Sequence, residues 1–408
     1  MTTRALQVLL AVAVSVLNAP WIEAQVVVRA TMLYTMSGPP ITDGVVVVRD
    51  GKVATVGRAA DVKIPAGFRE LQAAVVTPGL IDGHSVVGLT GQFNQRHDQD
   101  QLESSSPMQP ELRAVDAYNA HERLVGWVRS FGVTTVHTGH APGELISGQT
   151  IIVKTTGNTV EDALVVDTAA VAVTLGPWST KQGKSPGTRG KQVAMLRKKL
   201  DQARDYARKR SNGGPAGEER PARDIGLEVL ARVLNKEVPL LVTAQRAQDI
   251  ATALRLTREL DVRLWLDGAA ESYLLIDEIK AAGVPVILHP GMARANGELE
   301  NASFETAAHL RRAGIRVAMQ SGYEAYVPKT RVVLFEAAMA AANGLSFEET
   351  LATITIDAAR ILGIDRRVGS IAAGKDGDLA LYDGDPFEYT THCLATIVDG
   401  EVVHDTSR

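Results

Sequence analysis

Short hydrophobic runs, mostly separated by stretches with helical periodicity, dominate the middle of the chain. Eight of these runs are rich in β-branched residues and end in polar residues or glycine: LIDGHSV (from Leu80), VTTVHT (from Val133), IIVKT (from Ile151), AVAVTLG (from Ala170), VPLLVTA (from Val238), VRLWLD (from Val262), VPVILHP (from Val284) and IRVAMQS (from Ile315). Buried strands that alternate with helices are typical of a parallel sheet with crossover connections. We therefore predict an α/β fold, a (β/α)8 TIM barrel over residues 77–366, with any chemistry at the carboxyl ends of its strands.

The two ends of the chain carry a different pattern. VVVVR and KVATVG near the start are joined by Asp50-Gly51, and ATIVDGEVVH near the end has Asp399-Gly400 at its centre. Asp-Gly between two apolar runs is a strong hairpin signal. We predict that residues 25–76 and 367–408 form one small β-sandwich domain, discontinuous in sequence.

The first 24 residues have the outline of a signal peptide. Arg4 precedes an apolar run over residues 5–17, and Ala24 is a small residue before a cut ahead of Gln25. The run of about 13 residues is too short for a bilayer, which needs about 20. We expect a secreted or periplasmic protein with no integral membrane segment, and a buried N-terminal helix is the alternative.

Residues 178–223 interrupt the pattern after the fourth predicted strand. Gly- and Pro-containing loops flank a charged helix, whose cations include Arg197, Lys198, Lys199, Arg204, Arg208 and Arg210. We expect these charges to form a solvated helix face. The insertion as a whole is either a lid over the barrel or an elaboration of the surface.

Composition limits the partners that the chain can have. With 408 residues and 45% hydrophobic content, the chain can build one large core and a small satellite domain. A formal net charge of -4 favours neither nucleic acid nor an anionic membrane surface as a partner. Cys393 is the single cysteine, so an intrachain disulfide is excluded.

The most informative motif is VVTPGLIDGHSVV, residues 75–87. Leu80 to Val86 forms a short buried strand in this interpretation, and alternation of side chains puts His84 and Val86 on one face. Two histidines at these positions would provide two of the about three protein ligands that a catalytic metal site needs. Valine occupies the second position.

This stretch resembles the first barrel strand of the amidohydrolase superfamily, whose pattern is PG-[hydrophobic]-ID-x-H-x-H. Similarity to secreted, imidazolonepropionase-like amidohydrolases continues through residues 145–154, 221–234, 244–256 and 357–386. The resemblance covers nearly the whole mature chain. It implies a hydrolase fold that acts on non-peptide carbon-nitrogen bonds.

The resemblance also implies where the remaining metal ligands and the general base should lie. The family has a lysine on the fourth strand, His-Ala-His-Arg on the fifth, Glu-His-Gly on the sixth and an aspartate on the eighth. This chain has Ala172, then Thr243-Ala244-Gln245-Arg246, then Asp267-Gly268-Ala269, and finally Gly322. Only His84 is retained, so we predict a degenerate metal site and assign no catalytic residue.

The same positions predict a pocket at the barrel mouth. It is lined by His84, Val86, Ala172, Thr243, Gln245, Arg246, Asp267, Gly268, His289 and Gly322. We expect no cofactor there, unless His84, His137 and His289 have rebuilt a site for zinc or another divalent metal. We expect Lys154 to pair with a barrel carboxylate, and His97 and His121 to be solvated loop residues.

Three hypotheses of function follow from the missing ligands. The first is a non-catalytic binding or scaffold protein, working as a homodimer or as a heteromer with an intact amidohydrolase paralogue. The second is an active hydrolase of amide or other non-peptide carbon-nitrogen bonds, with a rebuilt metal site or by metal-free chemistry. The third is a receptor that binds a small molecule in the emptied pocket.

Overall fold

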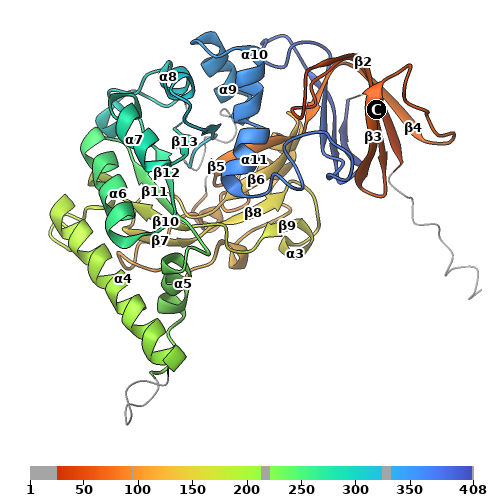
Figure 1. Ribbon diagram of the computed structural model, residues 1–408. Coiled ribbons are helices and arrows are strands. Elements are labelled where there is room, and N and C mark those ends of the chain that lie inside the picture. Colours follow the sequence, from red (N-terminus) through yellow and green to blue (C-terminus); the bar gives the residue numbers. More distant parts are fainter. Residues whose placement is uncertain (1–24, 94, 213–220, 290, 324–331, 407–408) are drawn as a thin grey trace, which may run out of the picture.

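The structure is a computed structural model, and it describes residues 25–93, 95–212, 221–289, 291–323 and 332–406 (Figure 1). The predicted signal peptide, residues 1–24, lies outside the described residues. Within the described ranges, every helix is too short or too polar to cross a membrane.

The two ends of the chain meet in one seven-stranded sheet. Its strands in spatial order are β17 (Glu401–Asp405), β16 (Cys393–Val398), β15 (Leu379–Tyr382), β4 (Arg69–Pro78), β1 (Val26–Leu33), β2 (Ile41–Arg49) and β3 (Lys52–Arg58). Pairing of β15 with β4, with Ala380 opposite Thr77, joins the ends. Both predicted hairpins are present, and all four Asp-Gly turn residues have the positive φ that a tight turn between twisted strands needs. The domain boundaries and the two-layer sandwich stay predictions.

All eight predicted strands of the main body are present. They are β5 (Leu80–Ser85), β6 (Val133–Thr138), β8 (Ile151–Lys154), β10 (Val171–Thr174), β11 (Leu240–Ala244), β12 (Leu264–Gly268), β13 (Val286–Leu288) and β14 (Val317–Met319). They belong to two sheets, β14-β13-β12-β11-β10-β7 and β5-β6-β8-β9, which also contain β7 (Ile146–Gln149) and β9 (Leu164–Val166). The described residues therefore form a mixed α/β fold in which these strands do not make one continuous, closed sheet.

The third strand runs against the direction that we predicted. Strand β8 is antiparallel to β6, and β7, which precedes it by one residue, is antiparallel to β10. Only residues 139–145 separate β6 from β7. A parallel connection needs a crossover of a dozen or more residues, so this short link turns the chain back.

The two sheets of the main body approach each other at two places. Beyond β14, Gly322 bridges in parallel to Ser85 of β5, and its N–H donates to the His84 carbonyl at 3.3 Å. On the other side Thr150 links β7 to β8, and its N–H donates to the Ala170 carbonyl at 2.9 Å. These contacts bring the carboxyl ends of β5, β11, β12 and β14 together.

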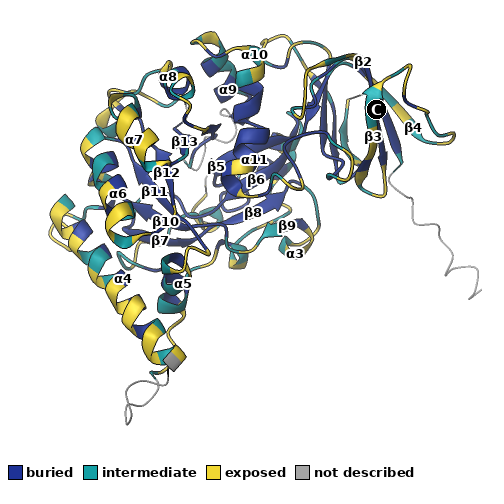
Figure 2. Cartoon of the chain, viewed as in Figure 1, coloured by how far each residue is buried: buried dark blue, intermediate teal, exposed yellow. Residues whose placement is uncertain are grey.

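Helices cover the outer side of the strands, with buried inner and exposed outer faces (Figure 2). They are α2 (Arg123–Arg129), α3 (Val160–Ala163), α4 (Arg189–Asn212), α5 (Ile225–Leu234), α6 (Ala247–Leu260), α7 (Ile276–Ala282), α8 (Thr306–Arg312), α9 (Val333–Ala342), α10 (Phe347–Thr353) and α11 (Ile356–Leu362). The described residues also form the short 3-10 helices η1 (Arg96–Asp98), η2 (Ala114–Asp116), η3 (Pro177–Ser179), η4 (Ser272–Leu274) and η5 (Gly297–Leu299).

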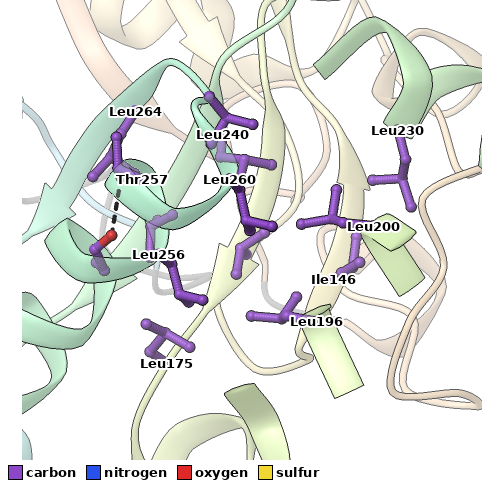
Figure 3. Close-up of a pocket in the computed structure, with 14 residues that line it drawn as sticks. Ile146, Leu175, Leu196, Leu200, Leu230, Leu240, Leu256, Thr257, Leu260 and Leu264 are labelled. Atoms are coloured by element: carbon purple, nitrogen blue, oxygen red, sulfur yellow. Dashed lines mark hydrogen bonds between the residues drawn. The ribbon is translucent and has the colours of Figure 1, made fainter. Parts of the chain in front are cut away.

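Helix α4, the main element of the insertion, packs into the core. Leu196 and Leu200 of α4 and Leu230 of α5 face the strands across a seam of mostly hydrophobic side chains, where a void of about 20 Å³ is left (Figure 3). The one polar side chain there, Thr257, donates to the Ala253 carbonyl of its own helix at 2.9 Å. The void is large enough for about one water but offers it no partner, so we expect it to be dry. Helix α4 is therefore part of the core, and whether the whole insertion is a lid or a surface elaboration stays a prediction.

Lys154 joins the body to the sheet of the chain ends, which corrects the prediction that it pairs with a barrel carboxylate. Its buried Nζ lies 2.5 Å from Asp378, 3.1 Å from Asp376 and 3.2 Å from Asp399. Burial alone lowers the pKa of Lys154, but these three carboxylates outweigh burial and raise it. The lysine therefore stays charged and neutralises part of a buried acidic cluster.

We predict that Lys154→Met destabilises the fold by about 3–5 kcal/mol, because it removes the cation paired with the buried carboxylate of Asp378. Urea unfolding followed by circular dichroism measures the change. Lys236→Met, which removes an exposed pair with Asp261, is the matched control and should cost at most about 1 kcal/mol. Equal losses in the two variants would contradict the role of Lys154.

Candidate active site

Three side chains from separate strand ends converge on the carboxylate of Asp267, on β12. The His84 Nδ1–H donates to Oδ1 at 3.0 Å, the Gln320 Nε2 donates to Oδ1 at 2.9 Å, and the Thr243 hydroxyl donates to Oδ2 at 2.6 Å. Burial alone raises the pKa of Asp267, but His84 and these hydrogen bonds outweigh it, and the pKa is lowered. Asp267 is therefore an ionised carboxylate that accepts bonds from β5, β11 and the end of β14.

His137, on β6, stacks on His84 with ring centroids 5.4 Å apart. Its Nδ1–H donates to the Gly83 carbonyl at 2.7 Å, and its Nε2 accepts from the Thr150 hydroxyl at 2.7 Å. Burial, with His84 stacked beside it, lowers the pKa of His137 to about 3. The ring is neutral at pH 7, and both of its nitrogens are already used by protein groups.

Two aromatic side chains cover His84 from the loop side. The Tyr323 ring lies 6.1 Å from His84, and Trp178 of η3 contacts Tyr323 edge-on at 5.7 Å. The amide of Gln245 donates to the Tyr323 hydroxyl at 3.2 Å. Under this cover His84 Nε2 is buried and has no hydrogen-bond partner among the described residues. It is the one imidazole nitrogen of the His84–His137 pair that is not engaged.

The side chain of Gln245 fills the space beside Gly268, where the family has a histidine. A Cβ atom at Gly268 would lie 2.3 Å from Gln245 Nε2, and the φ of Gly268 is +76°. Gln245 is held there because its Oε1 accepts from the Ala270 N–H at 3.1 Å. A histidine at position 268 would be strained by the backbone conformation, and the Gln245 amide would have to move to make room for it.

Asp82 holds the first strand to the eighth. Its carboxylate accepts from the Ser321 N–H at 3.0 Å and from the Ser321 hydroxyl at 2.5 Å. Burial raises the pKa of Asp82 to about 6, although the bonds from Ser321 oppose the shift. Asp82 lies two residues before His84 in the same strand, so its bonds to Ser321 help to position His84.

The other predicted pocket residues are buried near the same strand ends, but only some join the cluster. Val86 and Ala172 offer side chains without donor atoms, and the N–H of His289 donates to the Gly268 carbonyl at 2.8 Å. Arg246 turns away from Asp267 and bonds to Glu271 at 3.2 Å and to Glu300 at 2.7 Å. Arg246 is therefore a link between loops.

The donor set does not fit a catalytic metal ion. Within the described ranges, no group of three His, Cys, Asp or Glu side chains is placed to hold one. His137 in particular has no lone pair to offer, so the rebuilt site of His84, His137 and His289 is not supported. His84 Nδ1 is bound to Asp267, which leaves one imidazole nitrogen where about three protein ligands are needed.

A family model described as "Amidohydrolase family" matches residues 89–404. The chain belongs to the amidohydrolase family. This confirms the resemblance that the sequence motifs indicated.

Individual relatives agree with this family. Amidohydrolase tasK from Hapsidospora irregularis is 27% identical over 282 residues, 60% of this chain and 28% of that protein. The chain thus matches less than a third of the length of this relative. The crystal structure of an amidohydrolase from Thermotoga maritima MSB8 is 26% identical, with a TM-score of 0.87 over 93% of this chain and 100% of that one. A zinc-bound adenosine deaminase from Xanthomonas campestris shares the fold at a TM-score of 0.53, with 16% identity and 92% coverage of both chains.

Sequence comparison missed Gln320, Trp178 and Tyr323. Gln320 lies two residues before Gly322, the eighth-strand position that we compared, so a search for amide donors near that position could have found it. Trp178 and Tyr323 follow different strands, and no local pattern relates them. Their contact is a product of the fold.

We predict that His137 makes the protein less stable in acid. The unfolded histidine titrates near pH 6.5 and the folded one near 3, so the unfolded state binds more protons in between. The free energy of unfolding should fall by up to about 1.4 kcal/mol per pH unit as pH decreases through this range. Urea unfolding between about pH 4 and 6.5 measures this pH dependence, and the contribution of His137 should be absent in His137→Gln.

His309→Gln, which changes an exposed histidine, is the control and should keep the wild-type slope. An unchanged slope in His137→Gln would show that the ring is accessible to protons in the folded state.

Proposed function

We propose that this amidohydrolase-family protein is an exported, non-catalytic member that works by binding, as a scaffold or as the partner of an intact paralogue. The observation that carries the proposal is the Asp267 cluster. A metal hydrolase holds an ion at fixed coordination to activate water. Here the same strand ends direct their donors at a carboxylate instead, and Gln245 fills the neighbouring ligand position.

The proposal includes the barrel. We infer that the two sheets of the body are the arcs of one distorted (β/α)8 barrel, because the Gly322–Ser85 bridge and the Thr150 link join their edges. The high TM-score to an amidohydrolase over 93% of the chain supports this arrangement. Export rests on the pattern of residues 1–24 alone.

One observation favours a second candidate, a metal-free hydrolase. A carboxylate that accepts the Nδ1–H of a histidine orients the ring so that Nε2 can act as a general base. His84 has this arrangement, and its Nε2 is unoccupied. The buried position under Trp178 and Tyr323 argues against it, because a substrate would have to displace both rings.

The deciding experiment uses the chain from Gln25 onward, purified after growth with zinc, iron and manganese. We predict less than about a tenth of a metal ion per chain by elemental mass spectrometry, in a folded protein, because about three ligands are needed and one nitrogen is offered. We also predict no hydrolysis across a panel of amides and N-acyl amino acids.

Two variants separate the alternatives. About one metal per chain that disappears in His84→Ala but persists in His309→Ala would refute the proposal and support a rebuilt site. Turnover that survives a chelator but is lost in both His84→Ala and Asp267→Asn would establish the metal-free hydrolase.

A further inference from the structure

The surface beside α2 presents a row of three large side chains. Phe93 and Trp127 are exposed by 61% and 42%, and the Arg123 guanidinium lies 5.6 Å from the centre of the Phe93 ring. Arg123 and Trp127 are four residues apart on one helix and therefore share a face. Tryptophan and arginine are the residue types that most often dominate protein interfaces. We call Phe93, Arg123 and Trp127 the α2 row.

Trp127 is fixed in place from below. Its ring contacts Phe131 edge-on at 4.9 Å, and Phe131 contacts Phe335 of α9 edge-on at 5.2 Å. Edge-on contacts between the three rings therefore connect the exposed Trp127 to helix α9. A side chain already held in one position loses little entropy on binding, so Trp127 is a preorganised projection.

Hollows flank the same row. One of about 450 Å³ is lined by Gln92, Arg123, Leu124, Gly126, Trp127 and Ser130. The absence of a side chain at Gly126 keeps it open, since a Cβ there would find no atom closer than 3.7 Å. Such a hollow is wide enough to receive an indole ring. A projection and a matching depression thus lie side by side on one face.

Opposite charges lie on this face as well. A second hollow, of about 350 Å³, adjoins Phe93 and is lined by Asp98, Asp100 and Arg123 among others. His97 and His121 also line it and are exposed to solvent as we predicted, although His97 lies in the short helix η1 and not in a loop. The Arg123 guanidinium lies over the Phe93 ring, and the Asp98 carboxylate accepts a hydrogen bond from the Gln99 amide at 2.9 Å. A cation and two carboxylates therefore line this hollow.

We propose that the α2 row is an interface between two copies of this chain, related by a two-fold axis. An isologous interface has to be complementary to itself. This face offers two complementary pairings. Trp127 of each copy can enter the 450 Å³ hollow of the other copy. Arg123 of each copy can pair with Asp98 and Asp100 of the other copy. None of these residues belongs to the Asp267 cluster, so the inference stands independently of the proposed function.

Sedimentation velocity of the purified chain at concentrations up to about 100 µM tests the interface. We expect a dimer whose dissociation constant rises more than about tenfold in Trp127→Glu and in Arg123→Glu. Leu274→Glu, at a leucine that is 58% exposed on η4, is the control and should dimerise like the wild type. Circular dichroism shows whether Trp127→Glu, which loses the Trp127–Phe131 contact, is still folded. If it is unfolded, Arg123→Glu alone tests the interface.

Reversing the charges on the two sides of the interface tests whether Arg123 of one copy pairs with Asp98 and Asp100 of the other. The Arg123→Glu variant and an Asp98→Lys, Asp100→Lys variant should each dimerise weakly alone and recover association when mixed. A monomer at all concentrations would overturn the proposal, and so would a dimer that Trp127→Glu and Arg123→Glu leave intact. Association with a different chain but not with itself would also overturn it, in favour of a heteromer.

Discussion

The buried carboxylate of Asp267 is the constraint on which the centre of this protein depends. A charge inside a protein is costly unless other groups bind it, and Asp267 is fully buried. His84, Thr243 and Gln320 provide the required donors from three strand ends. Because these donors point at a carboxylate, hydrogen bonds between protein groups join the strands at the centre.

The side chains around His84 are engaged with one another, so the difference from the family pattern is not confined to one residue. Gln245 occupies the space beside Gly268, His137 gives both ring nitrogens to Gly83 and Thr150, and Tyr323 lies over His84. These substitutions support one another: Gln245 bonds to Tyr323, and His137 stacks on His84. A single reversion to histidine would therefore not restore a metal site.

Contacts outside the Asp267 cluster also stabilise the fold. Lys154 holds the body to the sheet of the chain ends through buried carboxylates, and Asp82 holds β5 to the end of β14. Helix α4 adds a hydrophobic layer outside the strands through Leu196 and Leu200. A scaffold that is stable without a metal can lose its chemistry and keep its surfaces, and the α2 row is one surface on which a function by association could rest.

The sequence by itself determined the strands, the family and the missing ligands. Each of these depends on local patterns, such as alternation along a strand, a turn at Asp50-Gly51, or the residue at position 86. It did not determine the direction of β8, the partners of Lys154 or the role of Gln320. Those depend on which distant segments meet in space, and only the tertiary structure, by bringing strand ends that are up to 239 residues apart into hydrogen-bond contact, decided them.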